Sequence, residues 1–154
     1  PEETEPRDVV RGRAKELTTK REKNYLEGRL GLIIDGTGKE AEKILRQKAK
    51  LEELGYDTYM IYVNTSLDVA LQRNAKRSRS LPEPIVVKSW KDVQANIGKF
   101  SNMFRQGFIV VDNNDAGEDI FKEVYKRVKG MLRKKVQNTR AKDWMASELA
   151  KKQR

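Results

Sequence analysis

Two groups of residues in this chain have types and spacings that could support ligand binding or catalysis. The first group is Asp35, Thr37 and Lys39, in the stretch GLIIDGTGKEAEKI that begins at residue 31. A carboxylate at the end of an apolar run could hold Mg²⁺, and the start of a following helix would attract a phosphate group. The alternative is that Asp35 and Gly36 only form a turn into that helix, because Asp and Gly are common turn residues.

The second group is a cluster of cations in the stretch RNAKRSRSLPEP, formed by Arg73, Lys76, Arg77 and Arg79. Arg73 and Arg77 are four positions apart, a spacing that predicts one shared helix face. The arginine fork fits phosphate oxygens, so arginines that end a helix before a proline-containing loop suit a lid over a triphosphate. Such a lid would stabilise the charge of a transferring phosphoryl group. The alternative is a solvated basic face without a ligand.

The glycine-rich stretch does not match the phosphate loop of nucleoside-triphosphate enzymes, whose motif is G-x-x-x-x-G-K-[ST]. Lys39 is followed by Glu40, and Ile33 occupies the position five residues before Gly38. The stretch does not contain G-x-G-x-x-G either. We therefore interpret Asp35 as a carboxylate at the C-terminal end of a buried strand, where open α/β sheets collect their ligands.

The composition excludes several kinds of chemistry. The 154 residues include no Cys and no His, which rules out disulfides, thiolate or imidazole metal sites and Ser-His-Asp triads. Catalysis would have to use carboxylates, Lys, Arg, hydroxyl groups or a metal held by oxygen atoms. No apolar run approaches the roughly 18–20 residues of a membrane span, and the acidic start PEETEPRDVV does not resemble a secretory signal. We expect a soluble protein of the cytoplasm, without a membrane partner.

The net charge of +10 is concentrated at one end of the chain. Residues 1–125 contain 22 Lys and Arg with 21 Asp and Glu, whereas residues 126–154 contain 11 Lys and Arg with only Asp143 and Glu148. This basic tail could make the chain a non-enzymatic binding module for nucleic acid or an acidic partner, or it could be a solvated helix face. Trp144 is the only aromatic residue of the tail, so base stacking has little support there.

Apolar periodicity predicts an α/β fold, with helices on both sides of a parallel sheet in three layers. β-type apolar runs predict about three strands, at 29–35, 56–65 and 107–115. Helical periodicity predicts further elements at 7–28, 38–55, 67–77, 85–104 and 116–132, and the remaining residues give a weaker helical signal. Alternation of helices and strands at this spacing is typical of a parallel sheet. We expect a domain over residues 1–130 and a basic helical tail over residues 131–154.

The order GLIIDGTGK, LEELGYDTYMIYVNTSLDVALQRNAKRSR and GFIVVDN resembles the C-terminal two-thirds of a zeta-toxin-like phosphate-loop kinase of the kind found in phage genomes. The resemblance covers about residues 9–130. Its most specific parts are the apolar-Asp-Gly-Thr strand end, the passage ELGYDTYMIYV and the helix ALQRNAKRSR. It implies an incomplete sheet of P-loop kinase type and a phosphotransferase that uses ATP or GTP with Mg²⁺. For a phage-encoded member of the family, the location would be the cytoplasm of the host.

The resemblance also implies a role for each group of residues. Asp35 and Thr37 would face the acceptor substrate and Mg²⁺, and the arginines would bind the nucleotide phosphates as a lid. The candidate catalytic residues are Asp35, Arg73 and Arg77. The candidate binding residues are Thr37, Lys39, Lys76, Arg79 and Asn96.

The phosphate loop of that family, and the catalytic Asp after it, have no counterpart in this sequence and would precede residue 1. We therefore expect a fragment or degenerate relative that binds no nucleotide tightly and is inactive alone, because positioning and charge neutralisation supply nearly all of the catalysis. In that topology the missing strand lies between the strands that match 29–35 and 56–65. Its absence predicts a rearranged sheet, or a homo-oligomer formed through the incomplete sheet.

Overall fold

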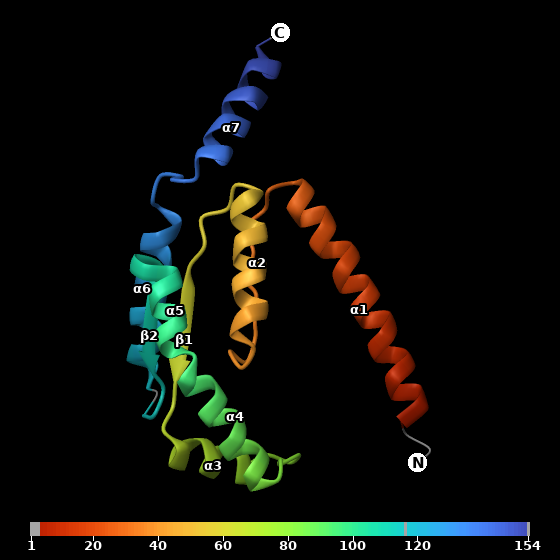
Figure 1. Cartoon of the computed structure of the whole chain (residues 1–154), viewed down its shortest axis with the longest axis vertical. Helices are drawn as coiled ribbons and strands as arrows, with labels where there is room; N and C mark the ends of the chain where they lie inside the picture. The colour runs from red at the N-terminus through yellow and green to blue at the C-terminus, as the bar shows by residue number, and fades with distance from the viewer. Residues whose placement is uncertain (1–3, 116, 154) are drawn as a thin grey trace. The chain divides into compact units, whose positions relative to one another are not determined.

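The computed structural model describes residues 4–115 and 117–153, with side chains from residue 7 onward. The chain forms two compact units, Pro1–Gly36 and Thr37–Arg154. Figure 1 shows that most of both units is helical. Among the described residues, no helix combines the length and the apolar character that a membrane crossing requires.

The first unit contains the helix α1 (Thr4–Glu27). Its side chains from residue 7 to residue 25 are exposed, and Val9, Val10 and Leu17 are among them. The helix ends where the sequence predicts, since the amide of Gly28 donates to Asn24 O at 3.0 Å. The charged residues on all sides of α1 explain why the helix can remain solvated over this length.

The predicted strand at 29–35 does not form, and this prediction is wrong. Residues 30–37 have no regular secondary structure. Ile33 is fully exposed, and about half of the surface of Leu30 and Ile34 is accessible. A strand needs the backbone groups of a neighbouring strand to satisfy its own. In the described part of the first unit, α1 is the only regular element and offers no such neighbour.

The second unit contains the sheet. Its elements follow one another as α2 (Ala41–Glu53), β1 (Met60–Asn64), α3 (Leu67–Ala75), α4 (Glu83–Ala95), α5 (Ile97–Phe104), the 3₁₀-helix η1 (Arg105–Gly107), β2 (Phe108–Asp112), α6 (Glu118–Leu132) and α7 (Thr139–Lys152). The strands predicted at 56–65 and 107–115 are confirmed as β1 and β2.

The two strands pair in parallel, with Met60 opposite Phe108 and Asn64 opposite Asp112. The connection from β1 to β2 passes through α3, α4 and α5, as a parallel pair requires a crossover. The mixed α/β class and the parallel direction are thus confirmed. The sheet of the described residues has two strands rather than about three.

The core of the second unit is small and aromatic. Phe100 of α5 is completely buried, and Tyr62 of β1 is 5% exposed. The rings of these two residues lie 6.5 Å apart, and the Tyr62 ring lies 6.0 Å from that of Phe108. Ala41, at the start of α2, completes the buried cluster. In Figure 1, α5 lies in front of the two strands. Phe100 of α5 packs with Tyr62 of β1 in this cluster.

Two helix termini lie at residues whose types favour the end or the start of a helix. Gly55 ends α2 with a φ of +104°, a conformation that glycine adopts most readily. The amide of Tyr56 then donates to Leu51 O and that of Gly55 donates to Glu52 O, both at 3.0 Å, which is the Schellman arrangement. Ser66 begins α3, because its side chain accepts from the amide of Val69.

The single helix predicted at 85–104 is divided into α4 and α5 at Asn96. Asn96 is the last cap of one helix and the first cap of the next. Its side chain forms hydrogen bonds with another segment of the chain, which are described below. Periodicity alone did not reveal this division, because the apolar face of the two helices continues across it.

Candidate functional site

The carboxyl ends of β1 and β2 carry a network of polar groups. Asp112 Oδ1, at the end of β2, accepts from the backbone amide of Asn114 at 2.9 Å and from its side-chain Nδ2 at 2.7 Å. Asn114 Oδ1 in turn accepts from the amide of Ser66 at 2.6 Å. The loop after β2 is therefore fixed against the start of α3, at the edge of the sheet where α/β proteins commonly bind ligands.

Arg73 reaches this edge from the last turn of α3. Its Nη2 atom donates to Asn114 O at 3.3 Å. The side chain is exposed, so the rest of the guanidinium fork faces solvent and could bind an anion. Of the candidate catalytic residues, Arg73 is the one that the structure places at the carboxyl ends of the strands.

A short basic loop follows α3. The side chain of Asn74 donates to Leu81 O at 2.8 Å and accepts from Leu81 N at 3.0 Å, which closes residues 75–80 into a loop. Lys76, Arg77 and Arg79 are exposed on this loop. Among the described residues, no carboxylate forms an ion pair with these three cations.

The predicted helix face shared by Arg73 and Arg77 is not formed. The helix α3 ends at Ala75 with Lys76 as its cap, so Arg77 lies in the loop. The reason is the pair of hydrogen bonds between Asn74 and Leu81, which turns the chain away from the helix axis. The loop position leaves Arg77 and Arg79 together with Lys76 but does not align Arg77 with Arg73.

The helix α4 packs across the end of β1. Trp90 Nε1 donates to Thr65 O at 2.7 Å, and Gln94 Nε2 donates to Asn64 Oδ1 at 2.8 Å. Tyr62 Oη donates to Val93 O at 3.2 Å. Burial raises the pKa of the Tyr62 phenol above its ordinary value of 10.0, because the buried site disfavours the charged form.

The same helix also fixes the turn before α2. Nδ2 of Asn96 donates to Gly38 O at 3.0 Å and to Lys39 O at 2.9 Å, and Asn96 is only 8% exposed. Lys39 Nζ donates to Ser89 Oγ of α4 at 2.9 Å. The structure thus brings Lys39 and Asn96 together, and Lys39 contacts α4, the helix that also contacts the carboxyl end of β1.

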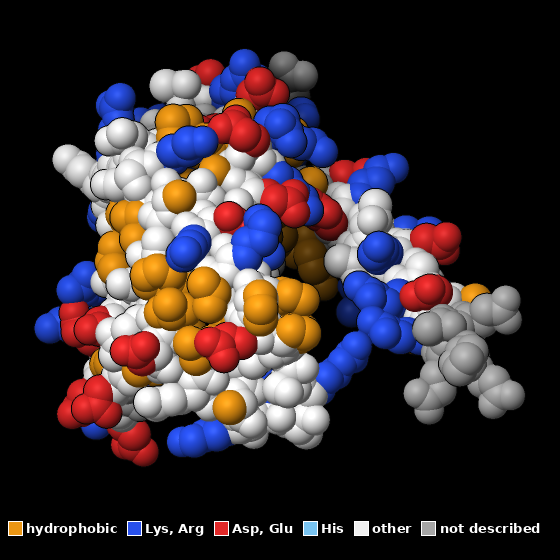
Figure 2. All heavy atoms as spheres, turned by 60° about the horizontal axis from the view of Figure 1, so that its bottom comes forward, with side chains coloured by type: hydrophobic (Ala, Val, Ile, Leu, Met, Phe, Trp, Pro, Cys, Tyr) orange, Lys and Arg blue, Asp and Glu red, His pale blue; other side chains and the backbone are white. Residues whose placement is uncertain are grey.

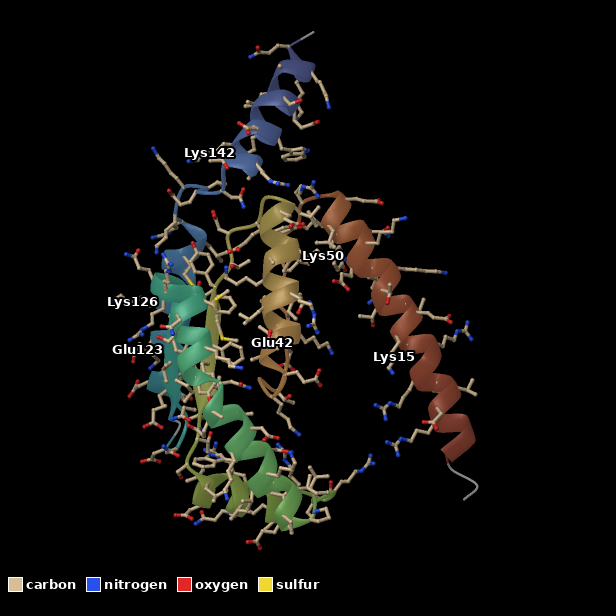
Figure 3. The ribbon with its side chains drawn as sticks, in the orientation of Figure 1. Lys15, Glu42, Lys50, Glu123, Lys126 and Lys142 are labelled. Carbon is tan, nitrogen blue, oxygen red and sulfur yellow. The ribbon has the colours of Figure 1, made fainter. Side chains whose placement is uncertain are left out.

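A shallow hollow of about 390 Å³ lies at the start of α2. Four cations line it, namely Lys39, Lys43, Arg46 and Lys99, together with Glu40, Ala41, Glu42 and Asn96. Glu42 forms an ion pair with Lys99 at 3.6 Å and so neutralises part of the charge. Figure 3 shows Glu42 near the lower end of α2, beside this turn. The hollow could accommodate an anion, but two carboxylates in its lining, Glu40 and Glu42, would compete with the anion for the cations.

The surface charge around these groups is mixed. In Figure 2, which brings the lower end of Figure 1 forward, hydrophobic side chains occupy the centre of the face, and acidic and basic side chains are interspersed around them. Binding of an anion therefore depends on individual groups such as Arg73 and the 75–80 loop, since no single continuous basic field covers this face.

Asp35 and Thr37 lie on either side of the boundary between the two units. Asp35 belongs to the first unit, and Thr37, like all the other candidate residues, belongs to the second. Both side chains are exposed. In the described parts of the chain, no group of three or more acidic side chains gathers where it could hold a metal ion.

Sequence reasoning missed several residues that organise this region, namely Asn64, Asn74, Trp90, Gln94, Asp112 and Asn114. A signal existed for two of them: Asp112 and Asn114 stand in the stretch VDNND directly after an apolar run, where polar residues commonly end a strand. The side-chain hydrogen bonds of the others join positions that are 7 to 30 residues apart, so short-range patterns do not reveal them.

Comparisons with models of protein families, with curated proteins and with solved structures found no match to this chain.

Proposed function

We propose that the second unit binds a phosphate ester such as ATP or GTP, as the substrate and lid portion of a kinase-like phosphoryl-transfer domain. The observation that carries the proposal is the position of Arg73, whose guanidinium is held by Asn114 O at the carboxyl ends of two parallel strands. Ligands of open α/β sheets bind at such ends, and arginine is well suited to phosphate oxygens.

The basic loop of residues 75–80 supports the same proposal. Lys76, Arg77 and Arg79 follow directly on the helix that carries Arg73, and Asn74 closes their loop. A loop that has exposed cations and few contacts with the rest of the protein can close over a bound phosphate chain and so act as a lid. Lys39, whose backbone is held by Asn96 and whose side chain contacts Ser89 of α4, would supply a further cation.

We also propose that this chain does not transfer the phosphoryl group by itself. Its sequence contains no G-x-x-x-x-G-K-[ST] motif, and the backbone cradle of that motif is a main source of phosphate binding and charge neutralisation. The described residues form no acidic cluster for a metal. Mg²⁺ would therefore arrive with the nucleotide phosphates, as is usual for this ion.

The test is a calorimetric titration of the full chain with ATP and Mg²⁺. We expect weak binding, with a Kd on the order of 0.1–1 mM, because the cradle is absent. Arg73→Ala should weaken binding about tenfold or more, since a charge-assisted hydrogen bond contributes about 1.5–3 kcal/mol. The control is Lys91→Ala, which removes an exposed cation of α4.

If the wild type and Arg73→Ala bind ATP with equal affinity, Arg73 does not contact the nucleotide and the proposed site is refuted. Turnover of ATP in the presence of an acceptor would contradict the proposed inactivity. Adenosine and inorganic triphosphate, titrated separately, show whether the phosphate chain carries the affinity, and triphosphate should be the better ligand.

A further inference from the structure

The last two turns of α6 (residues 126–132), the linker after it and α7 carry most of the excess charge of the protein. Between residues 126 and 153 there are ten Lys and Arg and only two acidic residues, Asp143 and Glu148. Within the described residues, ion pairs with carboxylates involve only Arg127 and Lys151 of these ten cations. No carboxylate of the described residues neutralises the charge of the other eight.

The start of α7 is firmly attached to the body of the second unit. Both oxygens of the Asp57 carboxylate accept backbone amides, from Gln137 at 2.9 Å and from Asn138 at 3.0 Å. Asn138 also donates to Glu52 O at 2.8 Å, and Arg140 donates to Glu53 O at 3.1 Å. These contacts hold the linker and the first turn of α7 against the C-terminal end of α2.

The remainder of α7 extends from this attachment with exposed side chains at 142–147 and 149–153. The helix has 14 residues and is therefore about 21 Å long. Figure 3 shows Lys142 near the start of α7 and Lys126 on the outer side of α6. An attached helix whose side chains are mostly exposed can enter a groove in a partner without any rearrangement of the body.

The cations of α7 lie on several sides of the helix. Arg140 and Lys151 are about three turns apart and share one side, whereas Lys142 and Lys152 lie on others. A helix that lies on a membrane has its cations on one face and its apolar residues on the other. The major groove of a nucleic-acid duplex is about 12 Å wide and has phosphates on both walls, which suits a helix with cations all round.

We propose that residues 126–153, from the last two turns of α6 through the linker and α7, form a surface that binds the phosphate backbone of double-stranded nucleic acid. The surface is distinct from the site proposed around Arg73, and either can fail without the other. Backbone binding of this kind is electrostatic and independent of sequence. It does not need stacking on bases, for which residues 126–153 offer only the ring of Trp144.

The experiment measures the anisotropy of a labelled duplex of about 25 base pairs with the full chain at salt concentrations of about 50 to 200 mM. The test variant combines Lys135→Ala, Lys142→Ala and Lys152→Ala. The matched control removes three exposed cations of α1 by Arg11→Ala, Lys15→Ala and Lys20→Ala.

We expect the wild type to bind the duplex and to lose affinity steeply as salt rises. The tail variant should bind on the order of 100-fold more weakly at about 0.1 M salt, with a salt slope smaller by about 2–3. The control should change by less than about threefold, and the tail variant should keep its affinity for ATP.

Three results would overturn the proposal. One is the absence of duplex binding at the lowest salt concentration. Another is an equal loss of affinity for the duplex in the α1 control, which would show that the duplex is attracted by the charge of the whole protein and not by the proposed surface. The last is tighter binding of polyglutamate, or of vesicles that contain phosphatidylserine, than of the duplex, since either would identify a different partner.

Discussion

The side chain of Asn96 holds the backbone of Lys39 in place, because Nδ2 of Asn96 donates to Lys39 O at 2.9 Å and to Gly38 O at 3.0 Å. The two residues are 57 positions apart in the sequence. Both were candidate binding residues, and the structure separates their roles. Lys39 carries the charge, and Asn96 positions the turn from which that charge extends.

The first prediction concerns this contact. Asn96→Ala would leave two carbonyl groups of the turn without their donor, so the free energy of unfolding should fall by about 1–3 kcal/mol. Urea denaturation measures the change. The control is Asn102→Ala, an exposed residue of α5, which should change stability by less than about 0.5 kcal/mol. Equal stabilities of the two variants would show that the contact contributes nothing.

The second prediction concerns Gly55, which ends α2. A Cβ atom at this position would meet the backbone N and Cα and the Cβ of Ala141 at 3.2 Å, and the φ of +104° is unfavourable for other residues. Gly55→Ala should therefore destabilise the protein by more than about 1 kcal/mol. Gly130→Ala is the opposite case, because beyond its own helix no described atom lies within 4 Å of the Cβ that alanine would add to α6.

Gly130→Ala should stabilise the protein by about 0.5–1 kcal/mol, since alanine is the better helix former. Thermal unfolding of the two variants beside the wild type measures both effects. If the midpoints of thermal unfolding of the two variants shift in the same direction from that of the wild type, the local geometry assigned to Gly55 or to Gly130 is wrong.

The third prediction concerns pH. Burial raises the pKa of Tyr62 above 10.0 in the folded protein, so the folded state keeps this proton at a pH at which the unfolded state loses it. The contribution to stability is complete below pH 10.0 and is lost as pH rises through the folded pKa. Tyr62→Phe removes this dependence, so the stability difference between wild type and variant should shrink above pH 10.0.

At neutral pH, Tyr62→Phe also loses the hydrogen bond to Val93 O, which should cost about 0.5–1.5 kcal/mol. Denaturation curves at several pH values test both parts. Tyr125→Phe is the control, because this tyrosine of α6 is 66% exposed. A difference that stays constant from neutral to alkaline pH would contradict the assigned burial.

The fourth prediction concerns the basic loop. Asn74→Ala removes both hydrogen bonds that close residues 75–80. The opened loop should be cut faster by trypsin after Lys76, Arg77 and Arg79, because proteolysis requires a locally unfolded segment. Gln72→Ala, at an exposed position of the same helix, should be cut at the wild-type rate. Mass spectrometry of the first fragments identifies the cleavage sites.

The fifth prediction concerns self-association. In the sheet that the structure describes, β1 and β2 each have one neighbour, so each leaves one edge unpaired. Exposed edges readily add a strand from another chain. We expect concentration-dependent dimers in sedimentation velocity, and Val63→Lys at an exposed position of β1 should weaken them. A single monomeric boundary at all concentrations would contradict this expectation.

The sequence predicted the elements whose signals are local. The helix α2 and its end at Gly55 follow from apolar periodicity and from glycine in the terminal position. The end of α1 at Gly28 was predictable in the same way, but the apolar periodicity predicted for α1 corresponds to no buried face, because its side chains from residue 7 to residue 25 are exposed. The start of α3 at Ser66 was predictable because a capping serine accepts a hydrogen bond from a backbone amide only three residues further along the chain. The strands β1 and β2 follow from their β-branched and aromatic residues.

The errors concern elements that depend on distant partners. The run 29–35 has the apolar residues of a strand, but a strand also needs a neighbour, and composition does not show whether one is present. The division of α4 from α5 depends on the contact between Asn96 and the turn at Gly38. The loop position of Arg77 depends on the bond between Asn74 and Leu81. Within the candidate site, the mutual positions of the residues depend on such distant contacts, and local patterns do not show them.

The pairing of Met60 with Phe108 has a consequence for how the protein folds. The two residues are 48 positions apart, so the sheet can form only after a long chain segment has closed, and such closure is entropically costly. Local helix formation in α3, α4 and α5 shortens the path between the strands before they meet. The two strands should therefore join late in refolding, after most of the helical signal has returned.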